Sequence, residues 1–131
     1  MIITLRNFDI PTATAQQRRH GANGRTWRSP GMTLAIATWK AALEPHTPAK
    51  PLEGPVKLCL SLHYHGRGKE PRYKVTRPDL DNTAKVVIDV MTSLGFWHDD
   101  NQIAVLELCK YVVPWASNVV IEVLPLDFTP A

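Results

Sequence analysis

The chain has 131 residues, of which 44% are hydrophobic and 21% charged, a balance typical of a globular domain that buries its own core. No run approaches the ~20 apolar residues that cross a bilayer, and the first residues lack the basic start and apolar stretch of a signal peptide, so a cytoplasmic protein without membrane contact is expected. The net charge of +3, from 15 Lys and Arg against 12 Asp and Glu, favours a polyanionic partner.

The first half of the chain predicts a strand, a helix and a second strand. Residues 1–7 are typical of a short strand, and residues 11–30 are polar, basic and rich in turn formers, which predicts a loop. Residues 32–43 are largely apolar and end before a proline, as a helix does. A proline-rich connector, residues 45–55, leads to residues 56–64, where apolar and polar residues alternate as in a half-buried strand.

The second half predicts a loop, a helix and two strands. Residues 65–78 are expected to be loop, and residues 79–94 carry an apolar stripe at helical spacing that ends before Gly95. Residues 102–113 and 118–124 both alternate, and the short turn between them predicts an antiparallel hairpin. The predicted fold is therefore α/β (α+β): a single domain over residues 1–131, with a mixed sheet of about four strands packed by two helices.

Clustered carboxylates flank the second predicted helix. Asp79 and Asp81 enter it, where the helix dipole favours anions and keeps carboxylates ionised, and Lys85 shares a face with Asp81 one turn further on. The pair Asp99-Asp100 follows the helix, and since consecutive loop residues point differently, one of the two is expected to face Asp79 and Asp81. Mg²⁺ prefers carboxylate oxygens, and Mg²⁺ with a nearby lysine meets the needs of phosphodiester hydrolysis.

Each part of this pattern also has a simpler interpretation. Asp79 alone is a helix N-cap, Asp81 and Lys85 alone are an i, i+4 ion pair, and residues 99–101 alone are turn chemistry. Asp89, about two turns beyond Asp81, is interpreted as a partner that pairs with Lys85 rather than as a metal ligand. On spacing alone, a metal site and a capping arrangement both stay open.

Two basic segments are candidates for phosphate contacts. The first lies directly before the acidic pair, has only Glu70 opposing it, and is expected to grip DNA phosphates, although a solvated loop would have the same composition; its cations are Arg67, Lys69, Arg72, Lys74 and Arg77. The second lies in the N-terminal loop and comprises Arg18, Arg19, Arg25 and Arg28.

Other reactive or bulky residues have structural interpretations. Cys59 and Cys109 lie in apolar strands and are expected to be buried without a catalytic or zinc role. His63 and His65 share a strand face and are expected to contact solvent or DNA, because a hard-ion site does not require imidazole. Trp39 and Trp97 are expected in the core or a dimer interface, and Phe96 and Trp97 are alternatively expected to pack the helix end and fix Asp100.

The two acidic segments together resemble the signature of the RusA-type Holliday junction resolvases. The resemblance is specific in residues 77–102, in the pattern Arg77-Pro-Asp79-Leu-Asp81-Asn82-x-x-Lys85, then Asp89, then Gly95-Phe96-Trp97-x-Asp99-Asp100-x-Gln102. Upstream, Arg19-His20 and Gly24-Arg25-Thr26 look like the basic N-terminal loop of that family. The resemblance extends more weakly from about residue 3 to residue 123.

The resemblance implies a small, homodimeric, Mg²⁺-dependent endonuclease, often prophage-encoded, that nicks four-way DNA junctions symmetrically, with Mn²⁺ as a substitute metal. It implies that Asp79, Asp81 and Asp100 are metal-binding catalytic carboxylates and that Lys85 is the catalytic lysine. The segments 45–55 and 65–76 look long for the family, which leaves the cleavage sequence preference open. Two other hypotheses are a non-hydrolytic protein that binds branched DNA and an unrelated small α/β protein whose acids only cap a helix.

Overall fold

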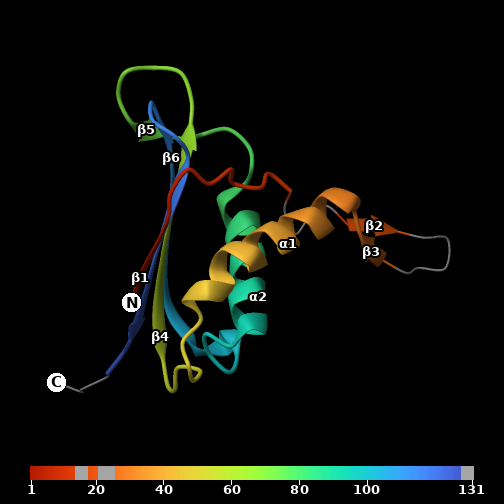
Figure 1. Ribbon diagram of the computed structural model, residues 1–131, viewed down its shortest axis with the longest axis vertical. Coiled ribbons are helices and arrows are strands. Elements are labelled where there is room, and N and C mark those ends of the chain that lie inside the picture. Colours follow the sequence, from red (N-terminus) through yellow and green to blue (C-terminus); the bar gives the residue numbers. More distant parts are fainter. Residues whose placement is uncertain (14–17, 21–25, 128–131) are drawn as a thin grey trace.

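A computed structural model describes residues 1–13, 18–20 and 26–127, with the backbone alone for 18–20 and 26–28. Its main feature is a mixed sheet whose strands lie in the order β1, β7, β4, β6, β5 (Figure 1). The fold class is as predicted, with one short strand more than expected. The strands are β1 (Ile2–Leu5), β4 (Val56–His65), β5 (Arg72–Tyr73), β6 (Ile103–Val113) and β7 (Asn118–Pro125).

The long strand β4 lies in the middle of the sheet. It pairs in parallel with β6, with Leu60 opposite Leu108, and antiparallel with β7, with Leu60 opposite Ile121. The predicted hairpin of residues 102–113 and 118–124 is therefore wrong, because β4 is inserted between its two strands. The physical reason is burial: the inward side chains of β4, such as Leu58 and Leu62, are fully buried, and a strand paired on both edges hides them best.

Both long helices cover the same face of the sheet (Figure 1). Helix α1 (Pro30–Leu43) begins two residues earlier than predicted, because Ser29 caps it by accepting a hydrogen bond from the Met32 backbone N–H at 3.1 Å, and proline is tolerated in a first turn. Helix α2 (Leu80–Leu94) follows the prediction, and Gly95 ends it in the left-handed region at φ 89°. Helix α2 is the crossover that makes β4 and β6 parallel.

The remaining described elements are short. Residues Arg18–His20 (β2) and Thr26–Arg28 (β3) pair antiparallel, in a segment predicted to be loop, and the pair lies beyond the N-terminal end of α1 and away from the main sheet (Figure 1). Two single-turn 3-10 helices are also present: η1 (Glu44–His46) directly follows α1, and η2 (Asp100–Gln102) directly precedes β6. Neither of the long described helices has the length and apolar content to cross a membrane.

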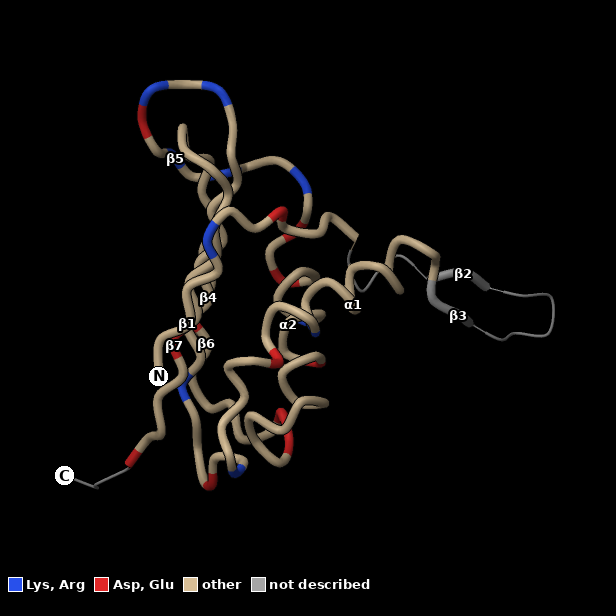
Figure 2. Tube along the Cα trace, in the orientation of Figure 1, with Lys and Arg blue, Asp and Glu red and all other residues tan. Residues whose placement is uncertain are grey.

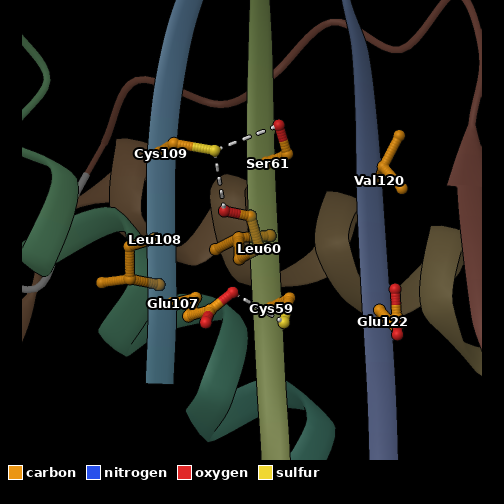
Figure 3. A pocket seen from close by; sticks show the side chains of 8 residues that line it. All are labelled: Cys59, Leu60, Ser61, Glu107, Leu108, Cys109, Val120 and Glu122. Atoms are coloured by element: carbon orange, nitrogen blue, oxygen red, sulfur yellow. Dashed lines mark hydrogen bonds between the residues drawn. The ribbon is translucent and has the colours of Figure 1, made fainter. Parts of the chain in front are cut away.

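The core lies between the helices and the inner face of the sheet. Trp39 and Trp97 are buried there with at most 1% exposure, so the expectation of a core position is confirmed for both. The Trp97 indole Nε1 donates to the Thr92 hydroxyl at 2.8 Å, which anchors the segment after α2 to the helix end. Cys59 and Cys109, by contrast, are free thiols that are only half-buried, on the face of the sheet opposite the helices (Figure 3); the prediction of burial was wrong for them.

Candidate active site

The first turn of α2 presents two exposed aspartates. Asp79 occupies the N-cap position with an extended backbone, and its carbonyl oxygen accepts the Thr83 N–H at 3.1 Å. Its carboxylate, however, makes no capping hydrogen bond to α2, and within the described part of the chain its one contact is a long 3.4 Å hydrogen bond from the Asn82 amide. The simple N-cap interpretation therefore does not explain the Asp79 side chain. Asp79 and Asp81 both leave oxygen lone pairs for a ligand at the positive end of the helix dipole.

The segment that leads into Asp79 is fastened to β6 by a lysine. The Lys110 ammonium group donates to the carbonyl oxygens of Thr76 and Pro78, each at 2.7 Å, and the Lys110 carbonyl accepts the Lys74 N–H at 3.0 Å. Pro78 itself is buried and follows a cis peptide bond. Lys110 thereby fixes the backbone one residue before the Asp79 carboxylate.

Sequence reasoning missed Lys110, although a signal was present. Leu106, Leu108 and Lys110 are two apart on β6 and so share one face. A lysine at a position where the alternation calls for an apolar residue has to place its charge against a polar partner. Here the partners are two backbone carbonyls of a loop, which no pattern in the sequence identifies.

Further along α2, Lys85 and Asp89 form the predicted pair. The Lys85 Nζ lies 3.8 Å from a carboxylate oxygen of Asp89, and both side chains are more than half exposed. An exposed i, i+4 pair of this kind stabilises the helix by only a few tenths of a kcal/mol, ~0.3–0.5. The Lys85 ammonium therefore stays available to an incoming phosphate, one turn beyond Asp81.

The neighbours Asp99 and Asp100 differ in their surroundings: the Asp99 side chain caps a short helix, and the Asp100 side chain is exposed. Asp99 caps η2, accepting the Asn101 N–H at 2.8 Å, and the Gln102 side chain completes a capping box through the Asp99 N–H at 3.0 Å. Asp100 is exposed and lines a shallow hollow with Ile88 and Ile103. A hydrogen bond with Asp99, then desolvation and the charges of Asp99 and Asp89, raise the pKa of Asp100, while Lys85 opposes the shift.

The candidate carboxylates form two groups along α2. Asp79 and Asp81 lie at its N-terminal end, whereas Asp100 lies within electrostatic reach of Lys85 and Asp89. In the part of the chain that the structure describes, no three His, Cys, Asp or Glu side chains come close enough together to hold one metal ion. The donor chemistry nevertheless fits a hard divalent cation, because the candidates are exposed carboxylates.

The basic loop, residues 66–78, lies at the end of the sheet next to the N-terminal end of α2 (Figure 2). Arg67, Lys69, Arg72 and Arg77 are exposed, and Arg72 donates to the Arg67 carbonyl at 2.6 Å, which braces the loop. Lys74 is more constrained: it donates to Thr76 at 2.8 Å, lies 5.1 Å from the Tyr64 ring centroid, and has a pKa lowered by burial and by Lys110. The arrangement places fixed and free cations beside exposed carboxylates.

The N-terminal basic patch is only partly described. Arg18, Arg19 and Arg28 have backbone positions in β2 and β3, and Arg25 lies outside the described residues. Their predicted DNA contacts stay predictions.

The two strand histidines are engaged within the protein. His63 Nε2 lies 2.7 Å from the Ser61 hydroxyl and its Nδ1 lies 2.8 Å from Asn118 Oδ1, while His65 Nδ1 lies 2.9 Å from the Trp115 carbonyl oxygen. Both ring nitrogens of His63 have protein partners, but its side chain is only half-buried, so the expected solvent or DNA contact stays a prediction. Ser61 also accepts from the Cys109 thiol at 3.3 Å, in a hollow on the face opposite the helices (Figure 3).

The family of the chain follows from its sequence match. A family model described as endodeoxyribonuclease RusA matches residues 10–123, which include α1, β4, α2 and β6. The chain belongs to the RusA endodeoxyribonuclease family. The predicted resemblance is thereby confirmed, and the RusA match covers every candidate carboxylate as well as Lys85 and Lys110.

A curated relative is similar over a shorter segment. The protein named crossover junction endodeoxyribonuclease rusA, from Lactococcus phage r1t, is 41% identical over 58 residues. The matched segment spans 43% of this RusA-family chain and 44% of the relative, less than half of each.

Proposed function

We propose that this RusA-family protein is a Mg²⁺-dependent endodeoxyribonuclease that resolves four-way DNA junctions by paired, symmetric nicks in recombination, repair or phage DNA processing. The observation that carries the proposal is the row of exposed acids and the lysine along α2, directly beside the braced basic loop. Carboxylates and cations on one surface fit metal-assisted cleavage of a phosphodiester.

The acids have a defined part in this chemistry. Asp79 and Asp81 at the entry to α2, and Asp100 near Lys85, would bind one or two divalent ions together with the DNA phosphate, and a bound ion supplies a more acidic water and neutralises charge on the phosphate. Among the described residues, the Asp79 carboxylate has a long 3.4 Å contact from Asn82 and no capping hydrogen bond, and the Asp81 carboxylate forms no ion pair, so ligand binding would cost the helix little. Mn²⁺ is expected to substitute, because it also prefers oxygen ligands.

The cations act on the DNA itself. Lys85 lies one turn beyond Asp81 on α2 and within electrostatic reach of Asp100, and it would stabilise the charge that develops on the phosphoryl oxygens. The exposed side chains of Arg67, Lys69 and Arg77 would bind phosphates that flank the scissile bond. Lys110 holds the entry to α2 in place and would preserve the distance between loop and acids.

We further propose that two copies of the chain act together as a homodimer. A four-way junction has approximate two-fold symmetry, and a C₂ dimer would present two equivalent sites to opposing strands. Sedimentation equilibrium of the free protein and of its junction complex would measure the stoichiometry. A junction complex that contains one copy of the chain would contradict the proposal that a bound homodimer makes both nicks.

The deciding experiment compares three DNA substrates: a synthetic four-way junction, a matched linear duplex and a replication-fork analogue, each with Mg²⁺ or with EDTA. The expected result is nicking of the junction at symmetric positions with Mg²⁺ only. Equal nicking of all three substrates would contradict junction specificity. Junction binding without any cleavage in Mg²⁺ would instead identify a non-hydrolytic branched-DNA-binding protein.

A further inference from the structure

Two stacked tyrosines lie where the basic loop joins the sheet. Tyr73 on β5 pairs with Tyr111 on β6, and the two rings stack with centroids 5.0 Å apart and planes 24° from parallel. Tyr73 is nevertheless 71% exposed. Since one face of its ring lies on Tyr111, the exposed area must include the opposite face, which is open to solvent.

The inner tyrosine is held in position by the sheet. Tyr111 lies in the continuous strand β6, and the His63 ring contacts it edge-on at a centroid distance of 5.4 Å and an angle of 71°. His63 is itself fixed by hydrogen bonds to Ser61 at 2.7 Å and Asn118 at 2.8 Å. Tyr73 therefore rests on a rigid support, and little conformational entropy is lost when a flat ligand stacks on it.

The same support connects the tyrosines to the candidate active site. Lys110, the neighbour of Tyr111, accepts the Lys74 N–H at 3.0 Å and holds the Thr76 and Pro78 carbonyls at 2.7 Å. The chain from Tyr73 to Asp79 is thus tied to one short piece of β6. A ligand stacked on the exposed face of the Tyr73 ring would therefore lie at a fixed distance from the Asp79 and Asp81 carboxylates.

The surroundings select the chemistry of that occupant. Arg72 and Lys74 flank Tyr73 in sequence, and Lys69 and Arg67 lie in the same loop. An exposed aromatic face among cations suits a nucleotide, whose base stacks while its phosphate pairs with Lys or Arg. A base inside a continuous duplex is covered on both faces by its neighbours, whereas in an open four-way junction a base at the branch point has one face without a stacked neighbour.

We propose that Tyr73, supported by Tyr111, stacks on a nucleobase exposed at the branch point of the DNA substrate. This inference rests on the proposed function and names the feature of the substrate that the protein reads. It gives a role to a large aromatic side chain that lies on a two-residue edge strand and gains little burial there. The stack would hold the branch point in register with the carboxylates on α2.

The test is junction binding in EDTA, where cleavage does not interfere. Tyr73→Leu keeps an apolar contact with Tyr111 but removes the ring, and it should weaken four-way junction binding by about 10- to 100-fold, the loss expected for one stacked base. Affinity for the matched linear duplex should not change. Tyr73→Phe should bind the junction like the wild type, and Val75→Ala, in the same loop, serves as the matched control.

A second measurement removes the base from the DNA and compares the effect with removal of the ring from the protein. A junction with an abasic nucleotide at the branch point should bind the wild-type protein as weakly as the intact junction binds Tyr73→Leu, and the abasic change should cost the Tyr73→Leu protein nothing more. Equal wild-type affinity for the abasic and intact junctions would overturn the inference, as would equal weakening of junction and duplex by Tyr73→Leu. Failure of the wild type to prefer the junction at all would instead overturn the proposed function.

Discussion

At the scale of single residues, the roles of the acids depend on which carboxylates are already engaged. Asp99 is occupied by the backbone of η2, whereas Asp79 and Asp81 have no hydrogen bond to the backbone of α2 from their side chains. Chemically identical groups in one motif can therefore be separated by their partners into structural members and candidate metal ligands. This distinction gives the substitutions below matched controls.

Replacing a candidate metal ligand should separate cleavage from binding. Asp79→Asn, Asp81→Asn and Asp100→Asn should each abolish junction cleavage while leaving junction affinity in EDTA unchanged or stronger, because a negative charge beside phosphate is lost. Asp99→Asn should be milder, and Glu44→Gln, an exposed acid after α1, should have no effect. Near wild-type cleavage by any of the three at saturating Mg²⁺ would exclude that residue as an essential ligand.

Lys85 should act mainly on the rate. Lys85→Ala should lower the turnover number by about 10²–10³ while affinity changes little, as for the loss of one preorganised electrostatic partner. Single-turnover cleavage at saturating protein would measure the chemical step, and Lys40→Ala on α1 provides a surface-lysine control. A loss of affinity that accounts for the whole defect would make Lys85 a phosphate contact only.

At the scale of elements, the site is assembled by a helix, a strand and the loop that Lys110 ties to them. Helix α2 was predictable because its apolar stripe and its terminal glycine are both local signals. The order of strands was not: four residues connect β6 to β7 and favour a hairpin, yet β4, far earlier in the chain, lies between them. The two-residue strand β5 and the three-residue strands β2 and β3 are too short for alternation to show.

The same limit applies to the candidate site. Local spacing identified the acids and Lys85, because they lie on one helix and the turn after it. Tyr73, Tyr111 and Lys110 were not identified as candidate residues, because their arrangement depends on pairing between strands that are distant in sequence.

Lys110 should act through position. Lys110→Met removes both carbonyl contacts, which loosens the entry to α2 and should raise the Mg²⁺ concentration needed for half-maximal cleavage about tenfold, comparable to loss of a supporting contact in other metal sites. Excess Mg²⁺ should restore most of the rate, which it would not do for Asp79→Asn. Lys57→Met, on the opposite face of the sheet and paired with Glu107, is the control. An unchanged Mg²⁺ dependence would show that the loop keeps its position without Lys110.

At the scale of the whole molecule, the two kinds of charge lie apart: the cations of the basic loop gather at one end of the sheet, and a row of acids follows α2 (Figure 2). Phosphate binding by the exposed loop cations should appear in the salt dependence of affinity. Replacing both Arg67 and Lys69 by Ala should flatten the slope of log K against log salt by about 0.9 for each lost phosphate contact. Cleavage at saturating DNA should survive. A slope that does not change would mark the loop as merely solvated and shift DNA binding to the N-terminal arginines.

The position of β7 in the sheet has a consequence for synthesis in the cell. This strand, almost the last described part of the chain, lies between β1 and β4 and provides the sheet partner of β1. Until residue 125 has left the ribosome tunnel, β1 has no neighbour in the sheet and β4 keeps one open edge. The nascent protein therefore completes its sheet only after β7 emerges, so the edges of β1 and β4 close after both long helices have been synthesised.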